Sequence, residues 1–375
     1  VCVIIDKHFV EITTFRKEAS YDDNRHPNKV YFAETIEDDL ARRDFTINAL
    51  AYSEQTGIID LFGGMRDIEK GVLRCVGEAE ERFNEDSLRI LRCLRFASQL
   101  GFSIDVATLG AMMKCKDKIK FLSKERILTE LNKTLLGDYV LDTLLKYKEI
   151  LFEIIPQLKS IDGLQQNSPY HIYDVYEHTI RTLPHVPKDN ALRLTMLLHD
   201  IGKAVTYSED KNGVGHFYNH GRKGKVIAQG ILTNLKISNK DRLLILELIK
   251  YHSDVLTDKK PNIKKWLNIF GKDHFINFLH IRYADCMAKE KETSKKNAEY
   301  LEKIRAVFNE IIDNKECYCI KQLDINGNDI IGLGKFPTEK TGKVLDLLLK
   351  AVIEEKVQNK NDKLIAYIKN IQTML

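Results

Sequence analysis

Apolar and β-branched residues alternate with short polar turns over the first 75 residues, which is typical of β-strands. The polar pair Asp6-Lys7 separates two of these runs, so a β-hairpin is expected at the start of the chain. Gly63 and Gly64 mark a second turn, which we interpret as structural. The expected strands occupy residues 1–5, 8–15, 58–62 and 72–76. Residues 21–29 are polar and rich in turn formers, and a loop is expected there.

From Glu85 onward the apolar residues follow a helical period. Leu88, Leu91 and Leu94 recur at every third position, which predicts a helix with an apolar ridge. Further helical patterns cover residues 105–155, a second unit that runs to about residue 310, and two segments that end at Leu375. The pattern therefore predicts an α+β chain in which a small β-sheet region precedes a predominantly α-helical remainder.

Composition narrows the class of protein without identifying it. The 375 residues are enough for two to four domains, and 43% hydrophobic with 30% charged residues is typical of a soluble chain. No apolar stretch approaches the roughly 20 residues that span a bilayer. The net charge is only +4, so a nucleic-acid surface requires local clusters of basic residues. Seven scattered cysteines without a Cys-x-x-Cys pair favour a reducing, cytoplasmic location.

Asp86 and Arg89 form the pair with the most specific chemistry. Three residues apart on a helix, they project from one face. The carboxylate can accept from an exocyclic amine while the guanidinium donates to the neighbouring ring acceptor, and only cytosine and adenine present that order. Guanine and uracil would leave both groups unpaired. The spacing alone also fits a solvated helix face with ordinary ion pairs.

Three motifs in order resemble class II tRNA nucleotidyltransferases, the family of CCA-adding enzymes and bacterial poly(A) polymerases. They are residues 42–50, which begin Arg42-Arg43-Asp44; residues 60–64 with Asp67 and Arg74; and residues 82–92, which contain Glu85-Asp86-Ser87-Leu88-Arg89. The resemblance implies that one group of residues binds the nucleotide: Arg42, Arg43, Asp44, Asn48, Asp86, Arg89 and Arg92. Guanidinium groups suit phosphate because they bond it bidentately. Asp44 could alternatively, or in addition, cap a helix.

The resemblance implies that CTP, ATP and tRNA are the partners and that Mg²⁺ is the cofactor of nucleotidyl transfer. It divides the chain into an incomplete nucleotidyltransferase head (1–75), a helical neck that recognises the base and binds RNA (76–155), an HD domain (156–310) and a tRNA-binding tail (311–375). A poly(A) polymerase or A-adding enzyme is the nearest alternative. The oligomeric state stays open.

The family's Asp-x-Asp pair, which holds the metal ions, does not occur in the 375 residues. We therefore expect that the chain begins inside the head domain and does not polymerise on its own. Glu11 on the first hairpin is a candidate supporting catalytic carboxylate, although a surface glutamate is an equally good interpretation.

The run His199-Asp200-Ile201-Gly202-Lys203 resembles the signature of HD phosphohydrolases. The resemblance implies a divalent-metal site with the ligands His178, His199, Asp200 and Asp285. His220 and His252 lie where some members of the superfamily add ligands for a second metal. Lys203 would contact the substrate phosphate. Imidazole and carboxylate from packed helices suit such a metal. A metal-dependent phosphohydrolase with a non-catalytic, RNA-binding head is thus the alternative from another functional class.

Basic residues near turns are the candidates for RNA contact. They are Arg25 and Lys29 in the polar loop, and Lys335, Lys340 and Lys343 in a C-terminal segment that resembles the tail of the same tRNA enzymes. Such contacts would hold tRNA by its shape and phosphates. Simple solvation of these lysines is an equally good interpretation.

Overall fold

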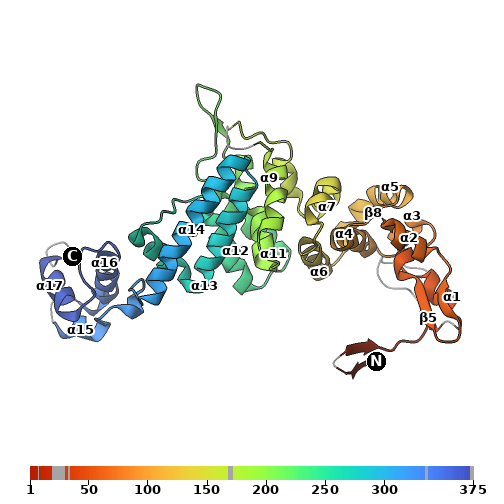
Figure 1. Cartoon of the computed structure of the whole chain (residues 1–375), viewed down its shortest axis with the longest axis horizontal. Coiled ribbons are helices and arrows are strands. Elements are labelled where there is room, and N and C mark those ends of the chain that lie inside the picture. Colours follow the sequence, from red (N-terminus) through yellow and green to blue (C-terminus); the bar gives the residue numbers. More distant parts are fainter. Residues whose placement is uncertain (7, 19–29, 33, 168–171, 334–336, 372–375) are drawn as a thin grey trace. The chain divides into compact units, whose positions relative to one another are not determined.

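The computed structural model describes residues 1–6, 8–18, 30–32, 34–167, 172–333 and 337–371. Most of these residues lie in helices, and the strands are short (Figure 1). The predicted α+β class is confirmed. By its internal contacts the chain divides into two compact units, Val1–Ile249 and Lys250–Leu375.

The described strands pair in twos. Four pairs are antiparallel (β1 with β2, β3 with β4, β5 with β6, β9 with β10), and β7 pairs with β8 in parallel. The bounds are β1 (Cys2–Ile5), β2 (His8–Glu11), β3 (Arg16–Glu18), β4 (Val30–Phe32), β5 (Leu50–Ser53), β6 (Gly57–Asp60), β7 (Val72–Leu73), β8 (Ser103–Ile104), β9 (Ser208–Glu209) and β10 (Gly215–His216). The predicted N-terminal hairpin is confirmed, but its second strand ends at Glu11 and not at residue 15.

The Gly63-Gly64 turn explains why β6 ends earlier than predicted. The Asp60 carboxylate accepts hydrogen bonds from the Gly64 and Met65 backbone N–H groups at 2.8 and 3.0 Å, which fixes the start of α2 (Gly64–Lys70). Gly63 has a φ of 74°, in the left-handed region that favours glycine. A Cβ on Gly64 would lie 2.2 Å from the Thr46 carbonyl oxygen. The structural interpretation of this turn is therefore confirmed.

Helices make up the rest of the first unit. The α-helices are α1 (Ile36–Ala41), α3 (Ala79–Glu85), α4 (Leu88–Leu100), α5 (Val106–Cys115), α6 (Lys124–Leu135), α7 (Val140–Lys146), α8 (Lys148–Ile154), α9 (Val175–Thr182), α10 (Asn190–Leu198), α11 (His220–Asn234) and α12 (Asn239–Tyr251). Short 3₁₀ helices are η1 (Thr46–Asn48), η2 (Lys116–Phe121), η3 (Pro156–Ile161), η4 (Leu183–His185) and η5 (Ile201–Val205). Helix α4 packs on α6 and α7 and buries Leu91 and Leu94.

One expected helix is interrupted at the motif that contains Asp86 and Arg89. Helix α3 ends at Glu85, Asp86 adopts an extended conformation (φ −141°, ψ 104°), and α4 begins at Leu88. The Asp86 carboxylate accepts a hydrogen bond from the Leu88 backbone N–H at 3.0 Å, which stabilises this break. The expectation that Asp86 and Arg89 share one helix face is therefore wrong, because a side chain of this type competes with the helical backbone for the same donors.

The elements in the described part of the second unit are all helices, and loops connect them. Its elements are α13 (Lys260–Met287), α14 (Lys291–Asp313), η6 (Ile320–Gln322), α15 (Gly327–Gly332), η7 (Thr338–Lys340), α16 (Thr341–Ile353) and α17 (Asn361–Ile371). Helices α13 and α14 lie side by side (Figure 1). Ile330, Val344, Leu348, Leu364 and Ile368 form the centre of a separate apolar cluster near the C-terminal end. The two helical patterns predicted there are confirmed as α16 and α17.

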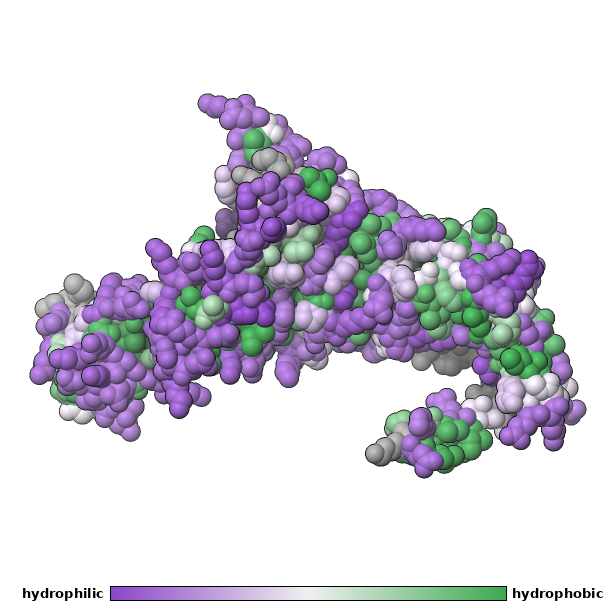
Figure 2. Space-filling model, in the orientation of Figure 1, coloured by the Kyte–Doolittle hydropathy of each residue, from purple (hydrophilic) through white to green (hydrophobic). Residues whose placement is uncertain are grey.

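Apolar residues on the surface gather at the N-terminal hairpin. Figure 2 shows apolar surface over β1 and β2, where Ile4, Ile5 and Phe9 are exposed. Among the helices of the described residues, none combines the length and the apolar character needed to cross a bilayer.

Candidate nucleotide pocket and metal centre

A cavity of about 510 Å³ lies in the first unit between η1, α4 and α6. All seven residues that the sequence assigned to nucleotide binding line it, together with two that it did not assign; the lining is Arg42, Arg43, Asp44, Asn48, Asp86, Leu88, Arg89, Arg92 and Arg126. Five arginines and two aspartates give the lining a formal charge of +3. A cavity with this charge suits a polyanion such as a nucleoside triphosphate.

Asp44 connects the first motif to α4. Its Oδ1 accepts from the Phe45 backbone N–H and from Asn48 Nδ2, both at 3.0 Å, and its Oδ2 accepts from Arg92 Nε at 2.6 Å. The residue is nearly buried. Asp44 does not cap η1, whose N-cap is Phe45 without a side-chain bond, so the capping alternative is wrong. Its carboxylate instead fixes Arg92 at the cavity.

Asp39 orients the two consecutive arginines, and the sequence analysis missed it. It is only 4% exposed on α1; its Oδ1 accepts from Arg42 Nη2 at 2.6 Å and its Oδ2 from Arg43 Nη2 at 3.2 Å. The acidic residues before Arg42, at i,i+3 and i,i+4 spacing, were a signal that could have identified it. Because one buried carboxylate holds both guanidinium groups, they stay directed toward the same region.

Asp86 and Arg89 both line the cavity, but they contact different partners. Asp86 Oδ2 accepts from Arg126 Nη2 on α6 at 2.8 Å. Arg89 is 7% exposed and donates to Glu85 Oε2 at 2.6 Å and to the Arg42 carbonyl oxygen at 2.9 Å. The bond to Arg42 joins the two motifs directly. Arg126 lies 40 residues from Asp86, so no local pattern pointed to it.

Cys75 pairs with Phe45 across an isolated β-bridge next to the first motif. Burial raises the pKa of its thiol to about 12, although a hydrogen bond with Thr108 and the charge of Arg89 act in the opposite direction. The thiol stays protonated at neutral pH, and the buried side chain of Cys75 packs in the core.

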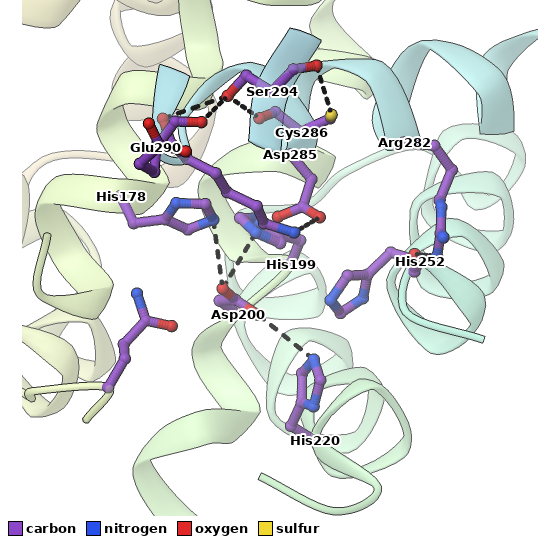
Figure 3. Close-up of polar contacts among 12 residues, drawn as sticks. His178, His199, Asp200, His220, His252, Arg282, Asp285, Cys286, Glu290 and Ser294 are labelled. Carbon is purple, nitrogen blue, oxygen red and sulfur yellow. Dashed lines mark hydrogen bonds and ion pairs between the residues drawn. The ribbon is translucent and has the colours of Figure 1, made fainter. Parts of the chain in front are cut away.

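The second group of functional side chains lies at the junction of α9, α10, η5 and α11 (Figure 3). His178, His199 and Asp200 are buried, and their ligand atoms lie within 4.8 Å of one another. The shortest distances from Asp200 to the imidazoles are 3.8 Å to His178 Nε2, 3.2 Å to His199 Nε2 and 3.4 Å to His220 Nε2. The structure thus brings together four of the six expected ligands within the first unit.

Hydrogen bonds on the far side of two imidazoles set their tautomers. His199 Nδ1 lies 2.7 Å from the Met196 carbonyl oxygen, and His220 Nδ1 lies 2.7 Å from the Phe217 carbonyl oxygen. A carbonyl oxygen only accepts, so each Nδ1 carries the proton, and in the neutral rings each Nε2 directs a lone pair toward Asp200. Three imidazoles and a carboxylate arranged in this way fit a divalent transition metal.

Close backbone packing positions these ligands. A Cβ on Gly202 would lie 2.1 Å from the His220 carbonyl oxygen and 2.5 Å from the Gly224 nitrogen. Only glycine therefore lets η5 approach α11. Lys203 follows on η5; its Nζ donates to Asp200 Oδ2 and to Gln166 Oε1, both at 2.7 Å. Gln166 is buried, and no sequence signal marked it.

The remaining expected site residues belong to other elements of the chain. His252 directly follows α12 and Asp285 lies on α13, both in the second unit; Asp285 forms an ion pair with Lys289 at 2.8 Å. Glu11 is exposed at the end of β2. Lys340 ends η7 as a half-buried residue, and Lys343 is exposed on α16. The expected RNA contacts Arg25, Lys29 and Lys335 lie outside the described residues.

Three family models match successive parts of the chain. The poly A polymerase head domain matches residues 1–74, the probable RNA and SrmB-binding site of polymerase A matches residues 101–161, and the HD domain matches residues 170–270. The pocket-lining motifs at 42–48 fall in the first match, and the residues 178–220 of the metal centre fall in the third.

Several related proteins and solved structures are CCA-adding enzymes. The CCA-adding enzyme of Staphylococcus saprophyticus is 31% identical over 367 residues, which cover 96% of this chain and 79% of that protein. That of Ligilactobacillus salivarius is 46% identical over 159 residues, covering 40% of this chain and 39% of that protein. The crystal structure of the Bacillus stearothermophilus CCA-adding enzyme in complex with CTP is 25% identical, covers 100% of this chain and 81% of that chain, and has a TM-score of 0.67.

Similarity of this extent, over nearly the whole chain, agrees with the order of motifs and with the cavity they line. The chain belongs to the class II CCA-adding enzyme family.

Proposed function

We propose that this chain binds CTP and ATP in the arginine-rich cavity and takes part in adding the 3'-terminal CCA of tRNA. The observation that carries the proposal is that seven residues from three separate motifs line one cavity of formal charge +3. The relatives named above are CCA-adding enzymes, which favours this function over that of a poly(A) polymerase or A-adding enzyme.

In this proposal Asp86 and Arg89 choose the base. The Asp86 carboxylate has lone pairs beyond those used by Leu88 and Arg126, so an exocyclic amine can add to these contacts or replace one of them. Arg89 is held by Glu85 and by the Arg42 carbonyl oxygen, which keeps its guanidinium at the cavity wall. A base that presents a carbonyl to Asp86 would place two acceptors against each other.

Arg42, Arg43 and Arg92 would bind the triphosphate. Each is oriented by a buried carboxylate, Asp39 for the first two and Asp44 for the third. Oriented guanidinium groups lose less conformational entropy when they bind phosphate.

Mg²⁺ is the metal expected for nucleotidyl transfer, but the residues present do not fit a two-metal site. The sequence contains no Asp-x-Asp pair, and Glu11 is a single exposed carboxylate. Asp44 and Asp86 in the cavity contact arginines. Binding and selection of the nucleotide are therefore the part of the reaction that the residues of this chain can perform.

Calorimetric titration with the four nucleoside triphosphates tests the proposal. We expect CTP and ATP to bind at least about tenfold more tightly than GTP and UTP. Asp86→Ala should reduce this preference, whereas Lys114→Ala should not, because Lys114 forms only an exposed ion pair with Glu80 on the same neck. Equal affinity for all four nucleotides, or selectivity unchanged in Asp86→Ala, contradicts the proposal.

A second activity is favoured by the cluster of buried His178, His199 and Asp200 with half-buried His220. We propose that it binds a divalent metal, with His252 and Asp285 as additional ligands, and hydrolyses phosphoesters. A metal bound there would act as a Lewis acid on the phosphoester. Lys203, whose ammonium group lies beside Asp200, would bind a phosphate oxygen.

Binding of Mn²⁺ and hydrolysis of 2',3'-cyclic AMP test this activity separately from nucleotide addition. We expect both to disappear in His199→Ala and in Asp200→Ala. His274→Ala is the matched control, because this histidine is exposed on α13. Metal binding without any affinity for CTP or ATP would instead favour a phosphohydrolase whose head only binds RNA.

We further propose the four domains and the tRNA-binding tail expected from the sequence. The matches of the family models to residues 1–74, 101–161 and 170–270 support the boundaries near residues 75 and 155. Lys340 and Lys343 are the described candidates for contact with the tRNA phosphates. Affinity for tRNA should fall steeply with salt concentration, and a flat response would contradict phosphate contact.

All seven cysteines are free thiols, which supports a reducing compartment such as the cytoplasm.

A further inference from the structure

Four aromatic residues lie within or next to the ends of a short hairpin that follows the run His199–Lys203. The hairpin consists of β9 and β10 and connects η5 to α11. His216 and Tyr218 stack with ring centroids 5.3 Å apart and an interplanar angle of 12°. Tyr207 and Phe217 form a second pair with centroids 5.4 Å apart. Tyr218 is 70% exposed, so the stacked pair presents one aromatic face to solvent.

The hairpin is joined to the metal centre by two contacts. Phe217 lies under Lys203, whose Nζ is 5.3 Å from the ring centroid. The Phe217 carbonyl oxygen accepts from the His220 backbone N–H at 3.2 Å and from His220 Nδ1 at 2.7 Å. Tyr218 is two residues from His220, so their Cα atoms are at most about 7.6 Å apart. The exposed ring therefore belongs to a residue whose backbone lies next to that of one candidate metal ligand, His220.

Polar contacts hold the aromatic residues in place. Asp210 Oδ1 accepts from the Asn212 and Val214 backbone N–H groups at 2.8 and 3.0 Å, and its Oδ2 lies 3.2 Å from His216 Nε2. Tyr207 donates to Glu209 at 2.8 Å and accepts from Asn167 at 2.9 Å. A platform fixed before binding costs little entropy when a ligand stacks on it.

We propose that the His216–Tyr218 pair is a base-stacking platform that makes the HD site select phosphoesters of nucleotides. The base stacks on Tyr218 while the phosphoester reaches the metal centre, and Arg222 and Lys223 in the first turn of α11 supply positive charge beside it. Exposed aromatic rings next to basic residues are a common means of binding single-stranded nucleic acid. This inference rests on the proposed phosphohydrolase activity and names its substrate class as a nucleotide or an RNA terminus.

Two substrates that differ only in the base test the platform. We compare 2',3'-cyclic AMP with the base-free methyl riboside 2',3'-cyclic phosphate, using the whole chain with Mn²⁺. Loss of one stacking contact in Tyr218→Ala should raise KM for cyclic AMP by roughly 5- to 150-fold, with kcat changed by less than about twofold. KM for the base-free substrate should stay the same, and Tyr218→Phe should retain the wild-type KM for cyclic AMP.

Tyr52→Ala is the matched control, since Tyr52 is 71% exposed on another hairpin, β5–β6. If Tyr218→Ala changes both substrates equally, or neither, the stacked pair only stabilises the hairpin and the inference is wrong. If the wild type hydrolyses neither substrate, the phosphohydrolase proposal fails. Fluorescence titration with etheno-AMP then tests the base-stacking platform by itself. Binding that is lost in Tyr218→Ala supports the platform, and binding that is absent from the wild type or unchanged in Tyr218→Ala overturns it.

Discussion

Replacing Asp44 with alanine should weaken both the fold of the head and its nucleotide pocket. The carboxylate accepts from three donors: the Phe45 backbone N–H, Asn48 Nδ2 and Arg92 Nε. Asp44→Ala removes all three hydrogen bonds at once. Arg92 then loses the contact that fixes it beside the cavity, and its side chain regains rotamer freedom that nucleotide binding must remove.

The expected loss of unfolding free energy follows from how exposed each of the three donors is to water. Phe45 is fully buried, so its N–H loses its partner without access to water, which costs about 1–3 kcal/mol. The Arg92 side chain is 33% exposed and can be rehydrated, so its ion pair contributes only about 0–1 kcal/mol. With Asn48 also partly solvated, the expected loss of unfolding free energy is about 2–4 kcal/mol in total.

Urea unfolding followed by circular dichroism measures this loss, and calorimetric titration with CTP measures the pocket. Asp60→Ala is the control, because Asp60 also caps backbone N–H groups in the head but does not line the cavity. We expect Asp60→Ala to cost about 0.5–2 kcal/mol and to leave CTP affinity unchanged. Asp44→Ala should lower CTP affinity at least about tenfold. If both variants lower CTP affinity equally, or if Asp44→Ala lowers the free energy of unfolding by less than about 0.5 kcal/mol, the reasoning is refuted.

Three further outcomes follow from backbone packing and burial. Gly202→Ala should force η5 away from α11 and lower both the Tm and the Mn²⁺ affinity, whereas Gly230→Ala, with open space around its Cβ position within α11, should stabilise that helix by about 0.5–1 kcal/mol. Desolvation acts to raise the pKa of Asp60, but four backbone N–H groups lower it on balance below the usual 3.8. The contribution of Asp60 to the free energy of unfolding is thus present above pH 3.8 and is lost as the pH falls through the pKa of the folded state. The free energies of unfolding of the wild type and of Asp60→Ala, measured with urea, should therefore become equal below that pKa. Burial raises the pKa of Cys75 to about 12, so mass spectrometry after iodoacetamide treatment at pH 8 should find Cys75 modified only in unfolded protein.

Local sequence patterns were sufficient for some elements and misleading for others. The hairpin around Asp6 and the Gly63 turn were predicted correctly, because each depends on residues within a few positions of one another. The helix break at Asp86 was missed. The apolar ridge of Leu88, Leu91 and Leu94 lies entirely after the break. The decisive interaction is a hydrogen bond from the Leu88 backbone N–H to the Asp86 carboxylate, which the apolar period does not report.

The sequence by itself determined the motifs, the secondary-structure class and seven of the nine residues that line the pocket, since these belong to short motifs of characteristic residue chemistry. Only the tertiary structure decided how those residues are held. Arg92 contacts Asp44 across 48 positions, Arg126 contacts Asp86 across 40, and Gln166 contacts Lys203 across 37. Such pairs form because packing of separate helices brings them together, and a one-dimensional pattern of apolar residues specifies which face of a helix is buried but not which partner faces it.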